Sequence, residues 1–492
     1  QRSRSISISL FTVPPFSHCR LAITNIMSFS KKSESTSTVP DFEAGDVVLD
    51  NIAELQNEKQ PWFTRRRFQI ITCVSLLIAA ICLCVVVPVV VIQSKNNNSS
   101  GGDDKNYGTV WIDLGPKIVG ELGNQELGES IALSSLGNIM AIGSNFHTAN
   151  TGILNVYEYS GSQWTQRGQT LFGTQIEDYF GSSTQLSDTG NILLVGGRGD
   201  ARGPNQFPGS VRAYQFNEVE DKWTPMGSEV KGQADGDQFG NSVSMSSNGQ
   251  TWIAGGDNLK GAGGERNGYA AVYHLSGGNW VQRGSLIPGN DGEWTGYAVA
   301  MSGDGNTVCV GDRAYNVPDV GVRGRARCFA WSGGNWNRKG GDLLGKTDFA
   351  AMGYSLALSD DGNTVVAGAR AGGDDSQGFV GVYAYNKGSW NQRGADMIGD
   401  SAGDQAGFQV AMSADGNVVA WSARKDNGAS ENTGVVRVLR WVGGNWVLLG
   451  SELGGDAESD HYGEAIALSS GGTIMAASSN LNVVEYAQVY VL

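Results

Sequence analysis

Hydrophobic and polar positions alternate in short runs that recur at a nearly constant spacing along most of the chain. In residues 240–245, Val243 and Met245 fall on one face and Ser242 and Ser244 on the other, and this period of two predicts a β-strand. Each such run starts at a glycine, reaches Leu or Met five residues later, and continues with Ser and, three residues beyond it, a second Gly. The seven anchoring glycines are Gly128, Gly181, Gly240, Gly296, Gly353, Gly407 and Gly463.

A second marker, Trp-x-x-x-Gly, also occurs seven times, and each copy lies 16 or 17 residues before an anchoring glycine. The Ser-x-x-Gly segment is typical of a hairpin turn, and a second and a third strand follow it before the Trp marker begins a fourth. Four-stranded units of about 55 residues, repeated seven times, predict an all-β, seven-bladed β-propeller over residues 108–492. The markers begin at Trp111, Trp164, Trp223, Trp280, Trp336, Trp390 and Trp446.

The two ends of the repeat array are complementary. The last unit stops after its third strand and has no Trp marker, whereas the marker from Trp111 to Gly115 comes before the first unit. We therefore predict that this N-terminal strand completes the seventh blade beside the strand that ends at Leu492, because closing the ring removes an exposed sheet edge.

The propeller follows one long apolar segment. Residues 68–92 carry no charge, and an apolar run of this length predicts one transmembrane helix, which we interpret as a signal anchor. Arg65, Arg66 and Arg67 precede the segment, whereas Lys95 is the only charge after it until Asp103. The positive-inside rule predicts a single-pass protein of the plasma membrane or a secretory-pathway membrane, with its N-terminus cytoplasmic and its propeller extracellular or lumenal.

The segments on either side of this predicted helix are polar. Residues 1–67 form a predicted disordered cytoplasmic tail, in which residues 1–26 precede the first Met and are either untranslated or similar in composition to a transit peptide. Residues 93–107 are an Asn/Ser/Gly-rich linker, which we expect to be flexible. It contains overlapping N-glycosylation sequons at Asn97 and Asn98.

The charge of the chain excludes one class of partner. Residues 1–100 carry 10 basic and 7 acidic side chains, which leaves 25 basic and 42 acidic side chains, a net charge of −17, for the remainder. Recognition of nucleic acid needs a basic surface, so we expect an extracellular protein or a glycan as the ligand, and no nucleic acid.

Several motifs resemble those of a known repeat family. Phe180-Gly181 and Phe239-Gly240, the Ser-x-Asp/Asn-Gly turns and the Gly/Ala run after the second strand are similar to FG-GAP repeats, which build the seven-bladed propeller of the integrin α-chain head. The resemblance implies a cell-surface adhesion or recognition module. The other five copies lack Phe before the anchoring glycine. The first hairpin is too short for the family's calcium loop, so no metal is expected there.

Length variation between the repeats points to the binding face. It is concentrated between the hairpin glycine and the third strand, and binding residues usually lie on variable loops that a rigid scaffold carries. The candidate loops lie near residues 198–207, 258–267, 313–322, 370–377 and 424–432. Arg198-Gly199-Asp200 is the tripeptide that animal integrins read, although in so glycine-rich a chain we interpret it as coincidence. The candidate ligand-binding residues are Arg198, Asp200, Lys260, Arg313, Asp319, Asp374, Arg424 and Asp426.

Signals for catalysis are weak. The four histidines are isolated, no nucleophile motif is present and no pair of carboxylates stands out, so we predict no catalytic residues, no cofactor and no enzyme activity. An extracellular propeller enzyme acting on glycans is the alternative. Cys309 and Cys328, on neighbouring strands of one blade, predict either a cross-strand disulfide or two buried thiols. An acidic residue three positions before five anchoring glycines predicts a turn-capping carboxylate rather than a metal ligand.

Overall fold

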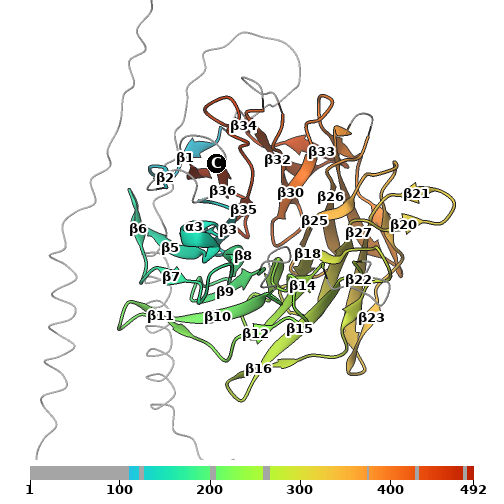
Figure 1. Ribbon diagram of the computed structural model, residues 1–492. Coiled ribbons are helices and arrows are strands. Elements are labelled where there is room, and N and C mark those ends of the chain that lie inside the picture. Colours follow the sequence, from blue (N-terminus) through green and yellow to red (C-terminus); the bar gives the residue numbers. More distant parts are fainter. Residues whose placement is uncertain are drawn as a thin grey trace, which may run out of the picture. The chain divides into compact units, whose positions relative to one another are not determined.

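The computed structural model describes residues 110–120, 127–199, 207–258, 266–373, 376–426, 432–479 and 485–492. These residues form seven antiparallel sheets arranged in a ring, so the chain is an all-β, seven-bladed β-propeller, as predicted (Figure 1). The predicted transmembrane segment, the linker and the sequons at Asn97 and Asn98 lie outside the described residues. Within the described ranges, no helix has the length and apolar character needed to cross a membrane.

Each blade contains one strand of each kind that the repeat pattern predicts. The first strands are β3 (Ser130–Leu133), β8 (Phe180–Leu186), β13 (Ser242–Met245), β18 (Thr295–Met301), β25 (Met352–Leu358), β30 (Ala406–Met412) and β35 (Ile466–Leu468). The second strands are β4 (Ile139–Ser144), β9 (Ile192–Gly197), β14 (Thr251–Gly256), β19 (Thr307–Asp312), β26 (Thr364–Ala369), β31 (Val418–Ala423) and β36 (Ile474–Ser479). The third strands are β5 (Ile153–Tyr159), β10 (Ser210–Asn217), β15 (Tyr269–Ser276), β22 (Arg325–Ser332), β27 (Phe379–Asn386), β32 (Val435–Val442) and β37 (Tyr486–Val491).

The fourth strand is more complex than the sequence predicts, because it is divided into two pieces. The piece at the Trp marker is β6 (Trp164–Gln166), β11 (Lys222–Pro225), β16 (Asn279–Gln282), β23 (Asn335–Arg338), β28 (Ser389–Gln392), β33 (Asn445–Leu448) or β1 (Ile112–Asp113). The second piece is β7 (Leu171–Phe172), β12 (Val230–Lys231), β17 (Ile287–Pro288), β24 (Leu343–Leu344), β29 (Met397–Ile398), β34 (Leu453–Gly454) or β2 (Ile118–Val119). Both pieces pair with the same third strand. The marker glycine between them has φ between 73° and 84°, a conformation that interrupts the edge strand and that only glycine adopts without strain.

Two small elements lie on the loops. The four-residue helix α3 (His147–Asn150) follows β4, and β20 (Asn316–Val317) pairs with β21 (Gly321–Val322) in a hairpin between β19 and β22.

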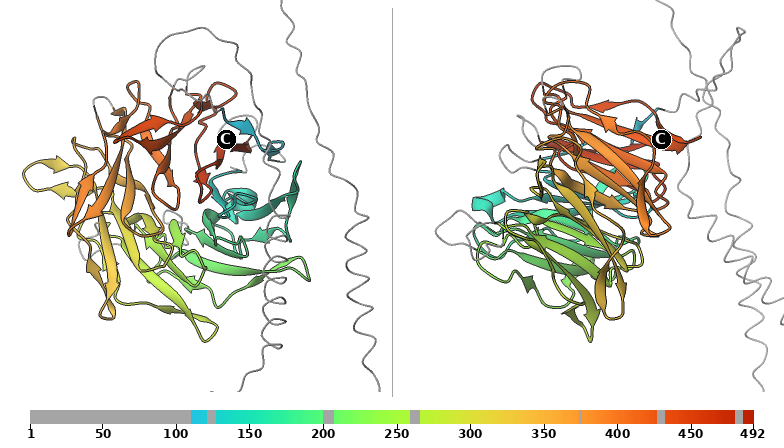
Figure 2. Two further views of the ribbon diagram at one scale, coloured as in Figure 1. Left: turned by 180° about the vertical axis from the view of Figure 1, so that it is seen from behind. Right: turned by 90° about the vertical axis from the view of Figure 1, so that its right-hand side faces the viewer.

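The ring closes through the N-terminal strand, as predicted. Ile112 pairs with Val491 and Asp113 with Tyr490, so β1 and β37 lie side by side although they come from opposite ends of the domain (Figures 1 and 2). The buried indole of Trp111 donates a hydrogen bond to the Leu449 carbonyl of the sixth blade, at 2.7 Å.

The same tryptophan contact joins every neighbouring pair of blades. Each marker indole N–H donates, at 2.6–2.9 Å, to the carbonyl of the residue just before the marker glycine of the preceding blade. Seven hydrophobic clusters lie between the sheets, and each cluster draws its residues from two neighbouring blades. The core is therefore a set of seven interfaces, which explains why the Trp marker recurs in every unit.

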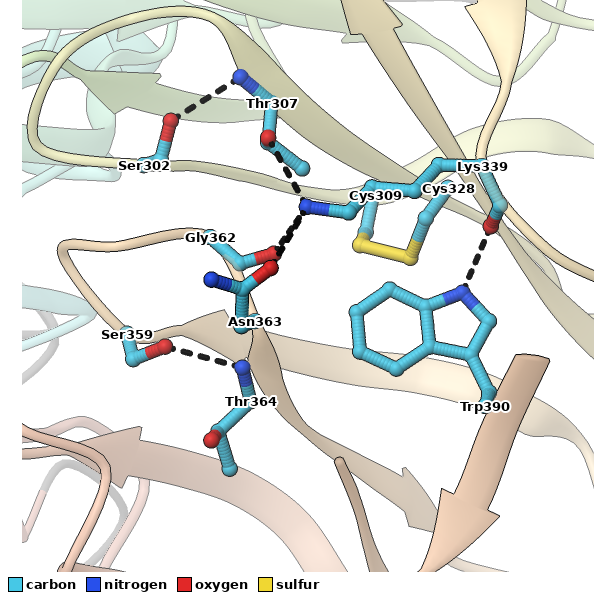
Figure 3. The surroundings of a disulfide bond; sticks show 10 residues. All are labelled: Ser302, Thr307, Cys309, Cys328, Lys339, Ser359, Gly362, Asn363, Thr364 and Trp390. Carbon is cyan, nitrogen blue, oxygen red and sulfur yellow. Dashed lines mark hydrogen bonds between the residues drawn. A yellow bond between two sulfur atoms is a disulfide. The ribbon is translucent and has the colours of Figure 1, made fainter. Parts of the chain in front are cut away.

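The fourth blade contains a disulfide between Cys309 on β19 and Cys328 on β22, which are directly opposite each other in the sheet (Figure 3). Beside it, Lys339 donates to the Gly362 carbonyl and the Asn363 side chain of the fifth blade, at 2.7 and 3.1 Å. The Trp390 indole donates in turn to the Lys339 carbonyl. Lys339 therefore links the fourth blade to the first hairpin of the fifth blade. At the equivalent positions, Arg167, Arg283 and Arg393 link their blades to the next one in the same way.

Candidate functional site

A central channel with a volume of about 520 Å³ runs along the first strands of all seven blades. One end of this channel is encircled by a ring of backbone hydrogen bonds between successive first hairpins. In this ring the N–H of one blade's hairpin donates to the carbonyl of the next at 2.9–3.0 Å, and the seventh bond returns to the first blade. The donors, in order, are Ser135, Asp188, Ser247, Gly303, Asp360, Ala414 and Ser470.

The residue that directly follows the second strand lies toward the opposite end of the channel, and the structure describes this residue in six blades. Two of the six, Arg198 and Arg424, line the channel itself. At this position the repeats place arginine four times, at Arg198, Arg313, Arg370 and Arg424. The other described copies carry Asn145 and Asp257. Because the position is equivalent in every blade, the ring brings these side chains to the same end of the channel, where the variable loops begin.

Three of the arginines stack on aromatic rings next to the anchoring glycines. The Arg313 guanidinium carbon lies 4.0 Å from the Tyr297 ring centroid, and the corresponding distances are 4.3 Å from Arg370 to Tyr354 and 4.2 Å from Arg424 to Phe408. Tyr297, Tyr354 and Phe408 line the channel, and the neighbouring ring centroids are 4.7 and 5.5 Å apart. The Trp294 ring centroid lies 4.2 Å from the same Arg313 guanidinium carbon. Stacking of this kind holds a guanidinium in place and leaves its edge free for hydrogen bonds.

Two buried acidic residues lie among these arginines. Glu464 on the seventh blade forms an ion pair with Arg424 at 2.8 Å. Burial raises the pKa of Glu464, although the charges of Arg424 and Arg370 favour its ionised form. Burial also raises the pKa of Asp257, and the positive charges of Arg313, Arg266 and Arg198 offset part of that rise. We call Arg198, Asp257, Arg266, Arg313, Arg370, Arg424 and Glu464 the arginine mouth.

Several buried polar atoms of this region lack a hydrogen-bond partner among the described residues. They are Nε of Arg313, Nε of Arg424, Oδ1 of Asp257, and both amide atoms of Asn145. Unpaired buried donors and acceptors are rare in folded proteins, and they usually mark a position where water or a ligand binds. The arginine mouth therefore has unused hydrogen-bonding capacity.

The structure brings three of the predicted binding residues, Arg198, Arg313 and Arg424, to the arginine mouth. Asp319 is exposed between β20 and β21, and Asp426 is buried with Oδ2 3.8 Å from an Arg437 nitrogen. Asp200, Lys260 and Asp374 lie outside the described residues.

Sequence reasoning missed Asp257, Glu464 and the aromatic rings. It included Arg370 only as the start of a candidate loop. Aligning the repeats on the last residue of the second strand would have found the four arginines as one set.

The acidic residues that precede the anchoring glycines cap turns, as predicted. Asp178, Asp237 and Glu293 each accept a backbone N–H three or four residues upstream. Asp404 and Asp460 do the same in the sixth and seventh blades. Across the part of the chain that the structure describes, no group of three or more His, Cys, Asp or Glu side chains could hold a metal ion.

No known protein family matches the sequence, and no curated protein matches it either. Solved structures resemble its fold. One is a proposed 6-phosphogluconolactonase from Bacteroides uniformis, 11% identical, with a TM-score of 0.48 over 67% of this chain and 86% of that one. Another is hydrazine synthase from Kuenenia stuttgartiensis, 12% identical, with a TM-score of 0.49 over 80% of this chain and 99% of that one. At these identities the similarity concerns the fold alone. The sheet topology itself shows a seven-bladed β-propeller, and no family is assigned to it.

Proposed function

We propose that this chain is a single-pass membrane protein that presents its propeller outside the cytosol and binds a ligand at the arginine mouth. The observation that carries the proposal is that four arginines occupy equivalent positions of different blades at one end of the channel: Arg198 and Arg424 line it, and Arg313 and Arg370 stack on rings that line it. The domain around them is acidic, with a net charge of −17 after residue 100. A positively charged site on an acidic domain favours an anionic ligand, which the rest of the domain surface repels.

A purely structural role would account less well for these arginines. Arginines that stabilise this propeller either pair with carboxylates, as Arg325 does with Asp312 and Glu293 at 2.6 and 3.0 Å, or donate to hairpin carbonyls, as Arg283 and Arg393 do. In contrast, Arg198, Arg313 and Arg370 form neither an ion pair nor a side-chain hydrogen bond with another described residue, and they contact aromatic rings instead. Their charges are therefore available to a ligand.

We further propose that the repeats are divergent FG-GAP units and that residues 68–92 anchor the chain in the plasma membrane or a secretory-pathway membrane. The buried Phe180-Gly181 and Phe239-Gly240 pairs at the starts of two blades support the first statement. The apolar run after Arg65 to Arg67 and the disulfide Cys309–Cys328, which is typical of oxidising compartments, support the second.

The orientation can be tested by adding protease to intact cells that make the full chain with a tag at each end. We expect loss of the C-terminal tag and protection of the N-terminal one. Protection of the propeller with digestion of the tail would overturn the orientation, provided that both tags are digested after detergent treatment.

Ligand binding can be tested with the detergent-solubilised full chain on an array of glycans and extracellular proteins. Arg313→Glu and Arg370→Glu should abolish binding, and their unfolding midpoints show whether the domain stays folded. Loss of binding only through changes in the hairpins at the opposite end, such as Asp360→Asn, would place the site on that end instead.

Asp360 also supports the second candidate function, an extracellular propeller enzyme acting on glycans. This carboxyl lines the channel, and burial together with the negative charges of Asp188 and Asp361 raises its pKa. A carboxyl with a raised pKa beside another carboxylate is typical of glycosidase acid–base pairs. Hydrolysis of an array glycan by the wild type, and its loss in Asp360→Asn, would favour the enzyme over the binding module.

A further inference from the structure

We propose that the ligand of the arginine mouth is a small polyanion with at least two carboxylate or sulfate groups, which enters the channel and is held by arginines of different blades. This inference rests on the proposed binding function and adds the chemical class of the ligand.

The charges of the arginine mouth form two groups. Asp257 lies near Arg198, Arg266 and Arg313, and Glu464 lies near Arg370 and Arg424. Each group therefore has more positive than negative charge, with three arginines against one acid in the first and two against one in the second. The two groups adjoin at Tyr354, whose ring centroid lies 5.9 Å from the Arg313 guanidinium carbon and 4.3 Å from that of Arg370. Two adjoining positive groups fit a ligand with two anionic groups better than an anion with a single charge.

The arginine side chains are preorganised for such a ligand by stacking on aromatic rings. Arg313 contacts the rings of Trp294 and Tyr297, whose centroids lie 4.2 and 4.0 Å from its guanidinium carbon. Such stacking reduces the side-chain freedom that binding would otherwise remove, and it leaves the planar N–H groups available for bidentate contacts with carboxylate or sulfate. The unpaired Nε atoms of Arg313 and Arg424 are donors that an anionic oxygen can satisfy.

The dimensions of the channel favour a small ligand over a protein segment. Its volume of about 520 Å³ falls within the range of about 300–1,000 Å³ that is usual for small-molecule sites. At the far end, backbone hydrogen bonds join the hairpins of successive blades into a ring. An anionic ligand is therefore expected to enter from the arginine mouth, where the positive charge is concentrated.

The test uses the detergent-solubilised full chain and calorimetric titration at constant ionic strength. The probes are citrate, a polysulfated disaccharide, and acetate as a control with a single charge. We expect saturable binding of citrate or the disaccharide at one site, and acetate at least about tenfold weaker because it reaches only one of the two groups. The stronger probe distinguishes a carboxylate ligand from a sulfated one.

Substitutions of single arginines test whether the probes bind at the arginine mouth. Arg313→Gln and Arg370→Gln, each from a different group, should weaken the better probe by about tenfold or more. The matched control is Arg440→Gln, which removes the same charge from an exposed position of β32 and should leave binding unchanged. The unfolding midpoint of every variant is measured, and Arg198→Gln replaces any variant that fails to fold.

Three outcomes would contradict a small polyanion as the ligand of the arginine mouth. If neither polyanion binds, or if the arginine variants bind as tightly as Arg440→Gln does, the inference is wrong. Binding of an array ligand that Arg313→Gln and Arg370→Gln weaken but that neither polyanion displaces also overturns it, while the proposed binding function at the arginine mouth stands. Arginine-dependent binding of an acidic peptide, without binding of either polyanion, would identify a protein segment as the ligand and reject a small one.

Discussion

Single residues of the repeat are constrained by contacts between blades rather than within them. The anchoring glycines have φ between 83° and 92°, and they pack against the second strand of the preceding blade. At Gly353, an added Cβ would lie 2.9 Å from the Gly311 Cα and closer still to the Arg325 carbonyl oxygen. Neither contact can relax without moving backbone, so glycine is required for two independent reasons.

We therefore expect Gly353→Ala to lower the free energy of unfolding by at least about 1–3 kcal/mol, the usual strain of a non-glycine residue in this region. Gly341→Ala is the control, because its Cβ would meet no atom within 4 Å. Urea unfolding of both variants measures the difference. Equal stabilities would mean that blade spacing adjusts freely at this glycine.

At the scale of the element, the first hairpin of every blade is held by its serine. The hydroxyl of Ser359 accepts the Thr364 N–H at 2.9 Å and donates to Asp361 at 2.6 Å. All seven copies accept the equivalent N–H five residues later, which explains why this position is always Ser.

Removing the hydroxyl leaves a buried N–H unpaired, so Ser359→Ala should cost about 1–3 kcal/mol of unfolding free energy. Ser389→Ala, at an exposed position of β28, should change it by less than about 0.5 kcal/mol. Urea denaturation compares the two variants. A loss at Ser359 no larger than that at Ser389 would show that water replaces the hydroxyl.

The same hairpins predict a pH dependence. Burial raises the pKa of Asp361, but hydrogen bonds from the Ser359 hydroxyl and from Asn363 outweigh it, so the net pKa is lowered. A carboxyl whose folded pKa is lowered stabilises the fold above its unfolded pKa, and this contribution is lost as pH falls through the lowered value. Between roughly pH 6 and pH 3, the wild type should therefore lose more stability than Asp361→Asn. Equal losses of unfolding free energy in the wild type and in Asp361→Asn would contradict this prediction.

The disulfide of the fourth blade closes a loop of 19 residues between β19 and β22. Cross-linking a loop of this length is expected to stabilise the fold by about 3 kcal/mol through the unfolded state. The double variant Cys309→Ala with Cys328→Ala should therefore unfold at lower urea concentration than the wild type. Adding a reductant should shift the urea unfolding midpoint of the wild type toward that of the variant and leave the variant's midpoint unchanged. If the reductant does not change the midpoint of the wild type, the disulfide does not stabilise the fold.

At the scale of the whole molecule, stability depends on closing the ring. Trp111 is buried in the cluster between the sixth and seventh blades, and β1 supplies the last sheet with its outer strand. Loss of a buried Trp alone costs about 3–5 kcal/mol, a large share of the roughly 5–15 kcal/mol of a typical domain.

A chain that begins at residue 120 should accordingly aggregate or melt at a lower temperature, whereas one that begins at residue 104 should fold. Thermal unfolding followed by circular dichroism compares the two chains. Equal melting temperatures would mean that the other strands hold the ring without β1.

The blade count, the strand order, the turn-capping acids and the closure by β1 could all be predicted from the sequence. Each of these follows from local chemistry that recurs in every unit: a period of two, a glycine with positive φ, a serine in a tight turn, a tryptophan with one partner. The division of the fourth strand was missed because the marker glycine was treated as part of a strand rather than as an interruption of it.

The composition of the arginine mouth was decided only by the tertiary structure. Arg198, Arg313 and Arg424 are far apart in the chain, and they meet because the ring places equivalent positions around one channel. Burial of Glu464 depends on the ring as well, because its partner Arg424 belongs to another blade. Asp426 appeared to be a binding residue in sequence, yet the packing of β32 places it beside Arg437. Charge and burial at such positions depend on neighbours that no local pattern specifies.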